Sequence, residues 1–524
     1  MWINRFIIYQ TSVLYLIIPI FFFFMGWLRT SIGLLLSIVL LTAYCSFSKL
    51  AKNLLSNDSL FHISKEHCVV FVILFIFLLC TGNTGFIGCW GNDIPWRNAI
   101  YQDLIHQPWP VIYDYSHSIL CYYITFWLLP AQVTSWLNLN EFGSNTVLFL
   151  WMYLGLVLIF LLLCDILQPQ KGHVLLVAIV FLFFSGINTL GMILRSFFIE
   201  PTPLITNTPG WGSWEFTNFH INGKDIVYLI RSTYINISDV YNQYFALAVS
   251  TLLFFRFRGY LKFYALIGLL TLPYSPIGFI GLLIVMFLDF IWNLCNKRSF
   301  HGYKKFVMEA FSATNSLAIL SIFPVFYFYY SMNVNATVIL NSKHTTFTGL
   351  LYIPWEQFSV GHLVILIIYY YLYFIIYARL IYDDYKNDYL YWIILLCLIM
   401  FPFFRIGTSS DFNFTATICP YLILCVLIQK HILKTLNSNC FSLKDLLLIF
   451  FLSIAMLTPV IQITSSLRGA YVHNTISYKD FSLQNAWDSQ LLKDSLRDKD
   501  IKSNGNFLAK DFERKVFYRI FAKR

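Results

Sequence analysis

Residues 6–27 read FIIYQTSVLYLIIPIFFFFMGW, a run without a single charged side chain. A stretch of about 20 predominantly apolar residues is long enough for an α-helix to cross the hydrocarbon core of a bilayer. Such runs recur along the whole chain, which is 58% hydrophobic and only 12% charged. An average soluble domain has about 25% charged residues. The sequence therefore predicts an all-α polytopic membrane protein.

Hydropathy and length predict about thirteen transmembrane helices. They are expected near residues 6–27, 31–47, 68–81, 146–163, 173–194, 237–255, 263–272, 277–293, 307–330, 362–377, 389–404, 414–428 and 446–463. These helices form a transmembrane domain of residues 1–463, and residues 464–524 form a polar C-terminal tail. Arg5 precedes the first run and no small-residue cleavage site follows it, so we interpret this run as a retained anchor.

Basic loops predict the orientation, because Lys and Arg beside membrane spans stay in the cytoplasm. Such loops lie around residues 49–65, 171, 256–262, 297–305 and 430–444. With these loops inside, the N-terminus is cytoplasmic, and the loops that hold Asp93 and Asp411 are external. Residues 118–137 are apolar enough to cross, but a crossing would move every later basic loop outside. We therefore interpret this segment as an interfacial or re-entrant helix interrupted near Pro130, within an external first long loop of residues 82–145.

Counting thirteen crossings from a cytoplasmic N-terminus makes the tail external. It carries 12 Lys and Arg against 7 Asp and Glu, which also suits a cytoplasmic tail. Its end, NFLAKDFERKVFYRIFAKR, has the composition of a basic amphipathic helix at a membrane surface. The net charge of +10 is spread over loops, where it sets topology and does not indicate nucleic-acid binding.

A polar stretch from Gly82 to Ser118 interrupts the apolar chain and contains GNDIPWRNAIYQDLI. Asp93 lies between flexible Gly91 and rigid Pro95, so it is either a general base held on fixed backbone or the cap of the following helix. Arg97 pairs either with Asp93 or with a substrate phosphate, for which its planar fork is suited.

The remaining candidates are less specific. Asp103 is expected on the solvated face of a helix, and Asp411 either caps a helix or lines a site with Arg405. Arg231 and Asp239 flank the start of a predicted span and so lie at the membrane surface. Asp93 is thus the catalytic candidate, and the substrate- or phosphate-binding candidates are Arg97, Asp103, Arg231, Asp239, Arg405 and Asp411. No residues are assigned as metal ligands, because the histidines of this stretch lack companions at ligand spacing.

Two segments carry a resemblance to a known family. The first is GNDIPWRNAIYQDLI with the following WPV and CYYITFWLLPA, and the second is RIGTSSDFNFTATICP. They resemble the GT-C superfamily of polyprenyl-phosphate-dependent membrane glycosyltransferases, in particular a group of uncharacterised bacterial GT-C-like proteins. That group has Asn where this chain has Ser410, and Arg where it has Thr415 or a neighbour. The resemblance implies an external first long loop with interfacial helices and an essential acid.

The leading functional hypothesis is transfer of a sugar from a polyprenyl-phosphate donor to a glycan or protein acceptor. It would occur at the outer face of a bacterial cytoplasmic membrane, in surface-glycan synthesis or protein glycosylation. Such a reaction needs a base for the acceptor hydroxyl and positive charge for the leaving phosphate. No cofactor is assigned, and a divalent metal stays open. The alternatives are a polysaccharide polymerase and a flippase or transporter of lipid-linked saccharides, although transporters place ionisable groups inside their spans.

Overall fold

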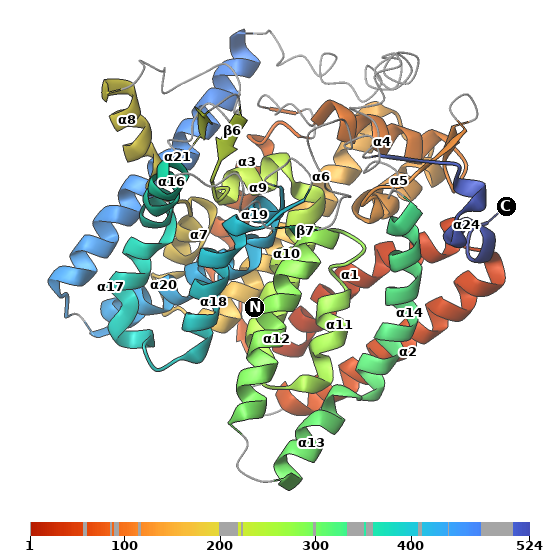
Figure 1. Ribbon diagram of the computed structural model, residues 1–524, viewed down its shortest axis with the longest axis horizontal. Coiled ribbons are helices and arrows are strands. Elements are labelled where there is room, and N and C mark those ends of the chain that lie inside the picture. The colour runs from red at the N-terminus through yellow and green to blue at the C-terminus, as the bar shows by residue number, and fades with distance from the viewer. Residues whose placement is uncertain are drawn as a thin grey trace.

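The structure is a computed structural model that describes residues 2–55, 60–83, 86–87, 94–113, 117–198, 218–221, 224–296, 300–332, 351–352, 360–406, 411–438, 440–472 and 507–523. Helices dominate these residues, and the strands form only short ribbons (Figure 1). The long helices are α1 (Arg5–Trp27), α2 (Thr30–Leu55), α6 (Glu141–Leu167), α12 (Pro276–Cys295), α14 (Ala313–Ser331), α20 (Ile418–Ser438) and α21 (Leu443–Val472). The shorter helices are α3 (Lys65–Leu79), α4 (Ile94–His106), α5 (Thr125–Trp136), α7 (Val174–Leu182), α8 (Asn188–Phe198), α9 (Thr233–Asp239), α10 (Tyr241–Arg256), α11 (Tyr264–Leu269), α13 (Phe300–Ala310), α16 (Val360–Tyr370), α17 (Ile376–Tyr385), α18 (Tyr389–Met400), α19 (Asp411–Ala416) and α24 (Val516–Ile520).

Four small antiparallel sheets connect segments that lie outside the long helices. β1 (Trp2–Asn4) pairs with β2 (Leu60–His62), β5 (Asn218–Ile221) with β6 (Lys224–Val227), and β7 (Leu351–Tyr352) with β8 (Arg405–Ile406). The only described three-stranded sheet has the order β3 (Ile112–Tyr113), β4 (Ser118–Leu120), β9 (Leu508–Lys510). It joins the first long loop to the C-terminal segment.

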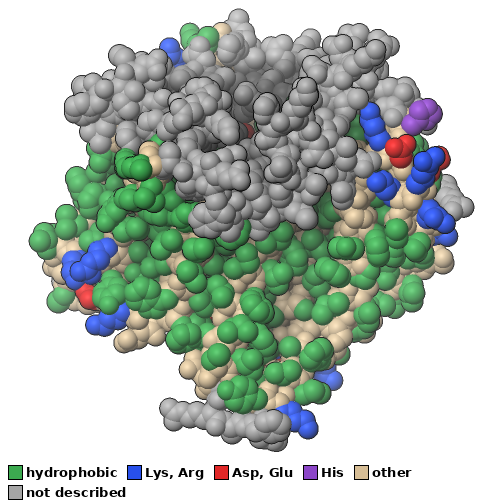
Figure 2. All heavy atoms as spheres, viewed as in Figure 1, with side chains coloured by type: hydrophobic (Ala, Val, Ile, Leu, Met, Phe, Trp, Pro, Cys, Tyr) green, Lys and Arg blue, Asp and Glu red, His purple; other side chains and the backbone are tan. Residues whose placement is uncertain are grey.

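Within the described residues, eight helical segments are long and apolar enough to cross a membrane, some of them made of two consecutive helices. They are 5–27, 30–55, 141–167, 276–295, 302–331, 363–385, 411–438 and 443–472. Figure 2 shows hydrophobic side chains across the broad middle of one face, with Lys and Arg at its margins. Leu283 and Phe287 of α12 and Leu320 and Phe323 of α14 are among the exposed large hydrophobic side chains. The chain is therefore a helical membrane protein that passes through the bilayer several times.

The predicted count of about thirteen spans is wrong for the described residues. The five runs near residues 68–81, 173–194, 237–255, 263–272 and 389–404 fall on helices of 6 to 16 residues. A helix packed inside the protein does not have to match the bilayer thickness, since other helices cover it. The run near 173–194 breaks around Gly186, whose Cβ would lie 2.8 Å from the Leu372 carbonyl oxygen. Apolar composition thus predicted spans where the structure has helices too short to cross. Of these, α10 and α11 are buried, whereas α3 and α18 carry exposed apolar side chains such as Val72 and Leu396.

The core is formed by helices that are apolar on all sides. The span over α19 and α20 is 94% buried, whereas the corresponding window of α2 is 28% buried. α10 packs against both α6 and α20 at this centre. The outer helices α2, α12 and α21 present one apolar face to the core and one to the surroundings, as lipid-facing helices do.

Local capping explains several helix starts. Asn4 Oδ1 accepts a hydrogen bond from Phe6 N–H at 2.9 Å, at the start of α1. Ser275 Oγ accepts one from Gly278 N–H at 3.1 Å, and Pro276 is the first residue of α12.

The expected interruption of residues 118–137 at Pro130 does not occur, because α5 continues through this proline. At 12 residues, or about 18 Å, α5 is nevertheless too short to cross a bilayer.

Candidate functional site

Helix α4 carries two candidates from the first long loop, and both are buried. It packs against α5, and only 3% of Arg97 and 6% of Asp103 are exposed. The expectation that Asp103 lies on a solvated face is therefore wrong. Its sequence surroundings are polar, but β3 and α5 cover the helix. Asp93, the residue just before α4, lies outside the described residues.

Asp103 has a specific partner in Tyr113 of β3, whose hydroxyl donates a hydrogen bond to Asp103 Oδ2. Burial raises the pKa of Asp103 from 3.8 to about 6, and the bond from Tyr113 opposes this rise. Burial disfavours the charged form of a carboxyl, whereas a donor stabilises it. Asp103 is thus an acid that can change protonation state near neutral pH.

The buried side of α4 also lies near the start of α10. Arg97 lies within electrostatic range of the Tyr241 hydroxyl. That hydroxyl accepts a hydrogen bond of 2.9 Å from Trp127 Nε1 of α5. Tyr101, one turn after Arg97, donates to the Ser144 carbonyl of α6 at 3.2 Å. Arg97 is accordingly buried near the Tyr241 hydroxyl, not on a solvated surface.

Two further candidates lie in the buried segment 228–242. Asp239 is the last residue of α9, two positions before Tyr241, and is 4% exposed. The Arg231 guanidinium carbon lies 5.2 Å from the centre of the Phe414 ring, and Asn413 Nδ2 donates to the Leu229 carbonyl at 3.2 Å. Arg231 and Asp239 were expected at the membrane surface. Both side chains are buried within the protein, because α19 and α10 pack over their segment.

The second motif approaches the first long loop. Asp411 is exposed and is the first residue of α19. Burial is the main cause that raises the pKa of Tyr123, and the electrostatic effects of Tyr122 and Asp411 raise this pKa further. Asp411 is therefore within electrostatic range of Tyr123 in the first long loop. The side chain of Arg405 lies outside the described residues, although its backbone pairs with Tyr352.

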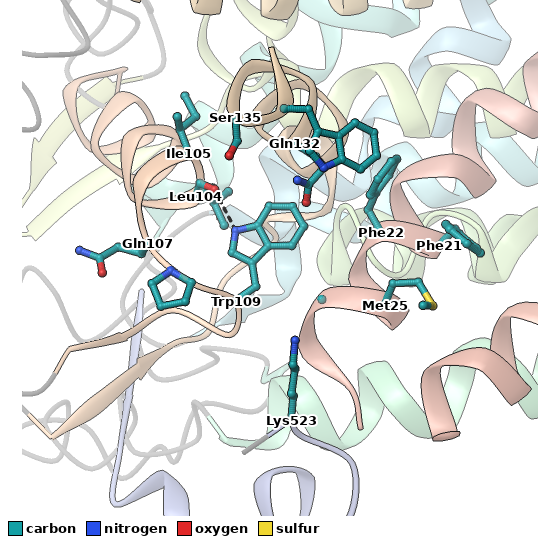
Figure 3. Close-up of a pocket in the computed structure, with 13 residues that line it drawn as sticks. Phe21, Phe22, Met25, Leu104, Ile105, Gln107, Trp109, Gln132, Ser135 and Lys523 are labelled. Carbon is teal, nitrogen blue, oxygen red and sulfur yellow. Dashed lines mark hydrogen bonds between the residues drawn. The ribbon is translucent and has the colours of Figure 1, made fainter. Parts of the chain in front are cut away.

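A pocket of about 610 Å³ opens beside α4 and is bounded by α1, α5 and the C-terminal segment (Figure 3). Phe21, Phe22 and Met25 of α1 form an apolar wall. The other walls contain Gln107, Gln132, Ser135, Trp109, Trp136 and Lys523. Pockets that bind ligands are largely apolar with a few polar groups that orient the ligand. This pocket has that character and combines it with one cation.

Trp109 forms part of the pocket wall and is held on two sides. Its Nε1 donates a hydrogen bond of 2.8 Å to the Leu104 carbonyl. Its ring covers Gly26 of α1, where an added Cβ would lie 2.4 Å from Trp109 Cε3. Glycine at position 26 thus allows the indole to approach the α1 backbone closely.

Lys523 reaches this pocket because the C-terminal segment folds back onto the first long loop. β9 pairs with β4, with Ser118 opposite Lys510. Arg29 Nε donates to the Ala522 carbonyl at 3.4 Å, and Lys523 N–H donates to the Trp27 carbonyl at 2.9 Å. The amphipathic helix predicted for this end is wrong, since a strand and the five-residue α24 replace it. The segment therefore lies on the same side of the protein as the first long loop.

Sequence reasoning did not identify Tyr113, Tyr241 or Lys523 as parts of this region. Tyrosine is abundant in the chain, so no pattern distinguishes these two. Lys523 is one of several basic residues in the tail, and only the β4–β9 pairing brings it to the pocket. Within the residues that the structure describes, no three His, Cys, Asp or Glu side chains are grouped to hold a metal ion.

Searches against protein-family models, curated proteins and solved structures return no match for this chain.

Proposed function

We propose that this chain is a GT-C-like membrane glycosyltransferase that moves a sugar from a polyprenyl-phosphate donor to a glycan or protein acceptor. The reaction would take place at the outer face of a bacterial cytoplasmic membrane, with the N-terminus in the cytoplasm. The observation that carries the proposal is the pocket beside α4. One wall comes from the membrane-spanning helix α1, and the other walls combine apolar side chains with the amides of Gln107 and Gln132 and the ammonium of Lys523.

This lining suits a donor that is part lipid and part charged. An isoprenoid chain would lie along Phe21, Phe22 and Met25, and the phosphate would lie near the Lys523 ammonium. Gln107 and Gln132 supply amides for sugar hydroxyls. A water-soluble substrate would gain little binding free energy from the apolar wall of α1. A lipid without a polar headgroup would leave the polar groups of the pocket without partners.

The chemistry assigned to Asp93 follows from its place directly before α4. As general base it would take the proton of the acceptor hydroxyl while that oxygen bonds to the anomeric carbon of the donor sugar. The bond from this carbon to the phosphate oxygen breaks, and polyprenyl phosphate leaves with its negative charge stabilised by a nearby cation. Arg97 and Lys523 are the cations assigned to that stabilisation.

The buried acids of the spans support an enzyme over a transporter. Asp165, near the end of α6, lies 3.1 Å from Arg5 Nε and 3.7 Å from Arg256 Nε. Asp289 of α12 accepts hydrogen bonds from Tyr264 and from Asn293. Each acid thus has structural partners, whereas transporters typically place ion- or substrate-binding groups near the bilayer midplane.

The test is retention of polyprenyl phosphate by the purified protein, measured by mass spectrometry, together with sugar transfer. Lys523→Ala should lower retained lipid about tenfold, as expected for loss of one charge-assisted contact. Lys510→Ala is the matched control, because Lys510 is exposed on the same segment but does not line the pocket.

Asp93→Asn separates binding from catalysis. It should leave retained lipid unchanged and reduce transfer by about 10²–10⁴-fold, the usual contribution of a general base. Arg97→Lys keeps the charge but loses the planar fork, so it should mainly weaken donor binding. Full transfer activity of Asp93→Asn would refute the assigned base, and absence of polyprenyl phosphate from the wild-type protein would refute the donor.

A further inference from the structure

A second pocket, of about 380 Å³, lies where α1, α3 and α7 begin and α6 ends. Arg5, His62, Ser64, His67, Gln168 and Lys171 provide its polar lining. The first pocket adjoins the opposite end of α1, where Phe21 and Met25 lie. The two pockets therefore belong to opposite membrane faces, and the second shares the face of the basic loops.

The electrostatics of the second pocket favour an anion. Asp165 lies between two arginines, 3.1 Å from Arg5 Nε and 3.7 Å from Arg256 Nε. Lys171 adds another charge at the rim and is exposed. The carboxylate of Glu66 accepts a hydrogen bond of 2.8 Å from Gly172 N–H, and Glu66 is not part of the lining. Among the residues that the structure describes, the lining contains no carboxylate.

Helix ends add to this positive potential. Arg5 and Val174 are the first residues of α1 and α7, and Ser64 caps α3. No side chain at the cap position bonds to the first turn of α7. The N-terminus of a helix presents free N–H groups and the positive end of its dipole, and both favour phosphate.

His67 is an independent observation at the same place. It is 4% exposed, and its Nδ1 accepts a hydrogen bond of 3.3 Å from Ser64 N–H. Nδ1 is thus the acceptor, and the neutral ring carries its proton on Nε2. Burial lowers the pKa of His67, which favours this neutral form. Nε2 has no hydrogen-bond partner among the described residues, so the pocket contains a buried donor that is not satisfied.

We propose that this second pocket binds a phosphate group, carried either by a soluble phosphate ester or by the headgroup of an anionic lipid. The volume accommodates a phosphate with a small organic substituent. Lys171 and Arg5 would supply the charge, and the first turn of α7 would supply backbone donors. The proposal does not depend on the glycosyltransferase assignment, since it concerns a different pocket on the other membrane face.

The experiment uses the full-length protein with two probes. In detergent, inorganic phosphate is titrated and the unfolding midpoint is recorded. In nanodiscs of phosphatidylglycerol or phosphatidylcholine, the lipid that stays bound is measured by native mass spectrometry after extraction. Each arm compares wild type with Lys171→Glu, which reverses a charge at the rim. Lys65→Glu is the matched control, because Lys65 is exposed at the start of α3 but does not line the pocket.

For a soluble ligand, phosphate should raise the wild-type midpoint saturably, and Lys171→Glu should weaken its apparent affinity at least about tenfold. For a lipid ligand, phosphatidylglycerol should be retained by wild type, and Lys171→Glu should reduce its retention by a similar factor. Lys65→Glu should change either value by less than about twofold. Equal responses of wild type and Lys171→Glu in both arms would overturn the proposal.

Discussion

Ionisation of Asp103 should make the folded protein less stable as the pH rises. Its pKa is about 6 in the folded protein against an ordinary value of 3.8, and burial is the main cause. One pKa unit corresponds to about 1.4 kcal/mol, so the ionised carboxylate lowers the free energy of unfolding by about 3 kcal/mol. The folded state binds this proton more tightly than the unfolded state. Stability from this group is therefore complete below about pH 4 and is lost as the pH rises through about 6.

The perturbation is Asp103→Asn, which keeps an oxygen for the Tyr113 hydroxyl but cannot ionise. The amide nitrogen changes the unfolding free energy by an amount that does not depend on pH. The prediction therefore concerns how the difference in unfolding free energy between variant and wild type changes with pH. The unfolding free energy of the variant should rise relative to that of wild type between about pH 4 and pH 6, by up to about 3 kcal/mol. Above this range the difference should stay constant to pH 8. The assay is equilibrium unfolding of the purified protein in detergent across this pH range.

Tyr113→Phe provides the control. It removes the hydrogen bond that lowers the Asp103 pKa, so the loss of stability should shift to a higher pH. A difference between Asp103→Asn and wild type that does not change from pH 4 to pH 8 would refute the reasoning. It would mean that Asp103 is hydrated in the folded protein and that α4 is not covered as described.

Three further predictions test packing, charge pairing and topology. Gly281→Ala should lower the unfolding free energy by about 1–3 kcal/mol, because the added Cβ would lie 2.5 Å from a backbone oxygen of α19. Gly268→Ala should leave the unfolding free energy unchanged in the same assay, because its nearest neighbour lies at 3.5 Å. Asp165→Asn removes the buried carboxylate that lies beside Arg5 and Arg256 and should lower the unfolding free energy by about 2 kcal/mol. Single cysteines at Asn138 and Lys171 should be labelled from opposite sides of the membrane, and labelling from one side would contradict the placement of the two pockets.

The long spans were predictable because a run of about 20 apolar residues has few stable environments other than a bilayer. The runs near 6–27 and 277–293 match α1 and α12 closely. Shorter runs were ambiguous, since a buried helix and a spanning helix have the same composition. The run near 263–272 corresponds to the six-residue α11, which packs against α14 and α12.

The candidate region was predictable only as a place in the chain. The stretch that contains Asp103 was identified from its polar and aromatic residues, but the side chain was assigned to solvent. Periodicity within one helix cannot show which neighbours will cover it. Burial of Asp103 depends on Tyr113 and α5, and burial of Arg231 depends on Phe414, which is far away in the sequence.

The sequence by itself determined the membrane class, the long helices and the polar interruptions between them. These follow from local composition, because each residue contributes its own transfer free energy whatever its partners are. Only the tertiary structure decided which polar groups are buried, which apolar runs are short core helices, and that Lys523 returns to the pocket of α1 and α4. Those outcomes depend on contacts such as Ser118 with Lys510, between segments that the chain brings together only when it folds.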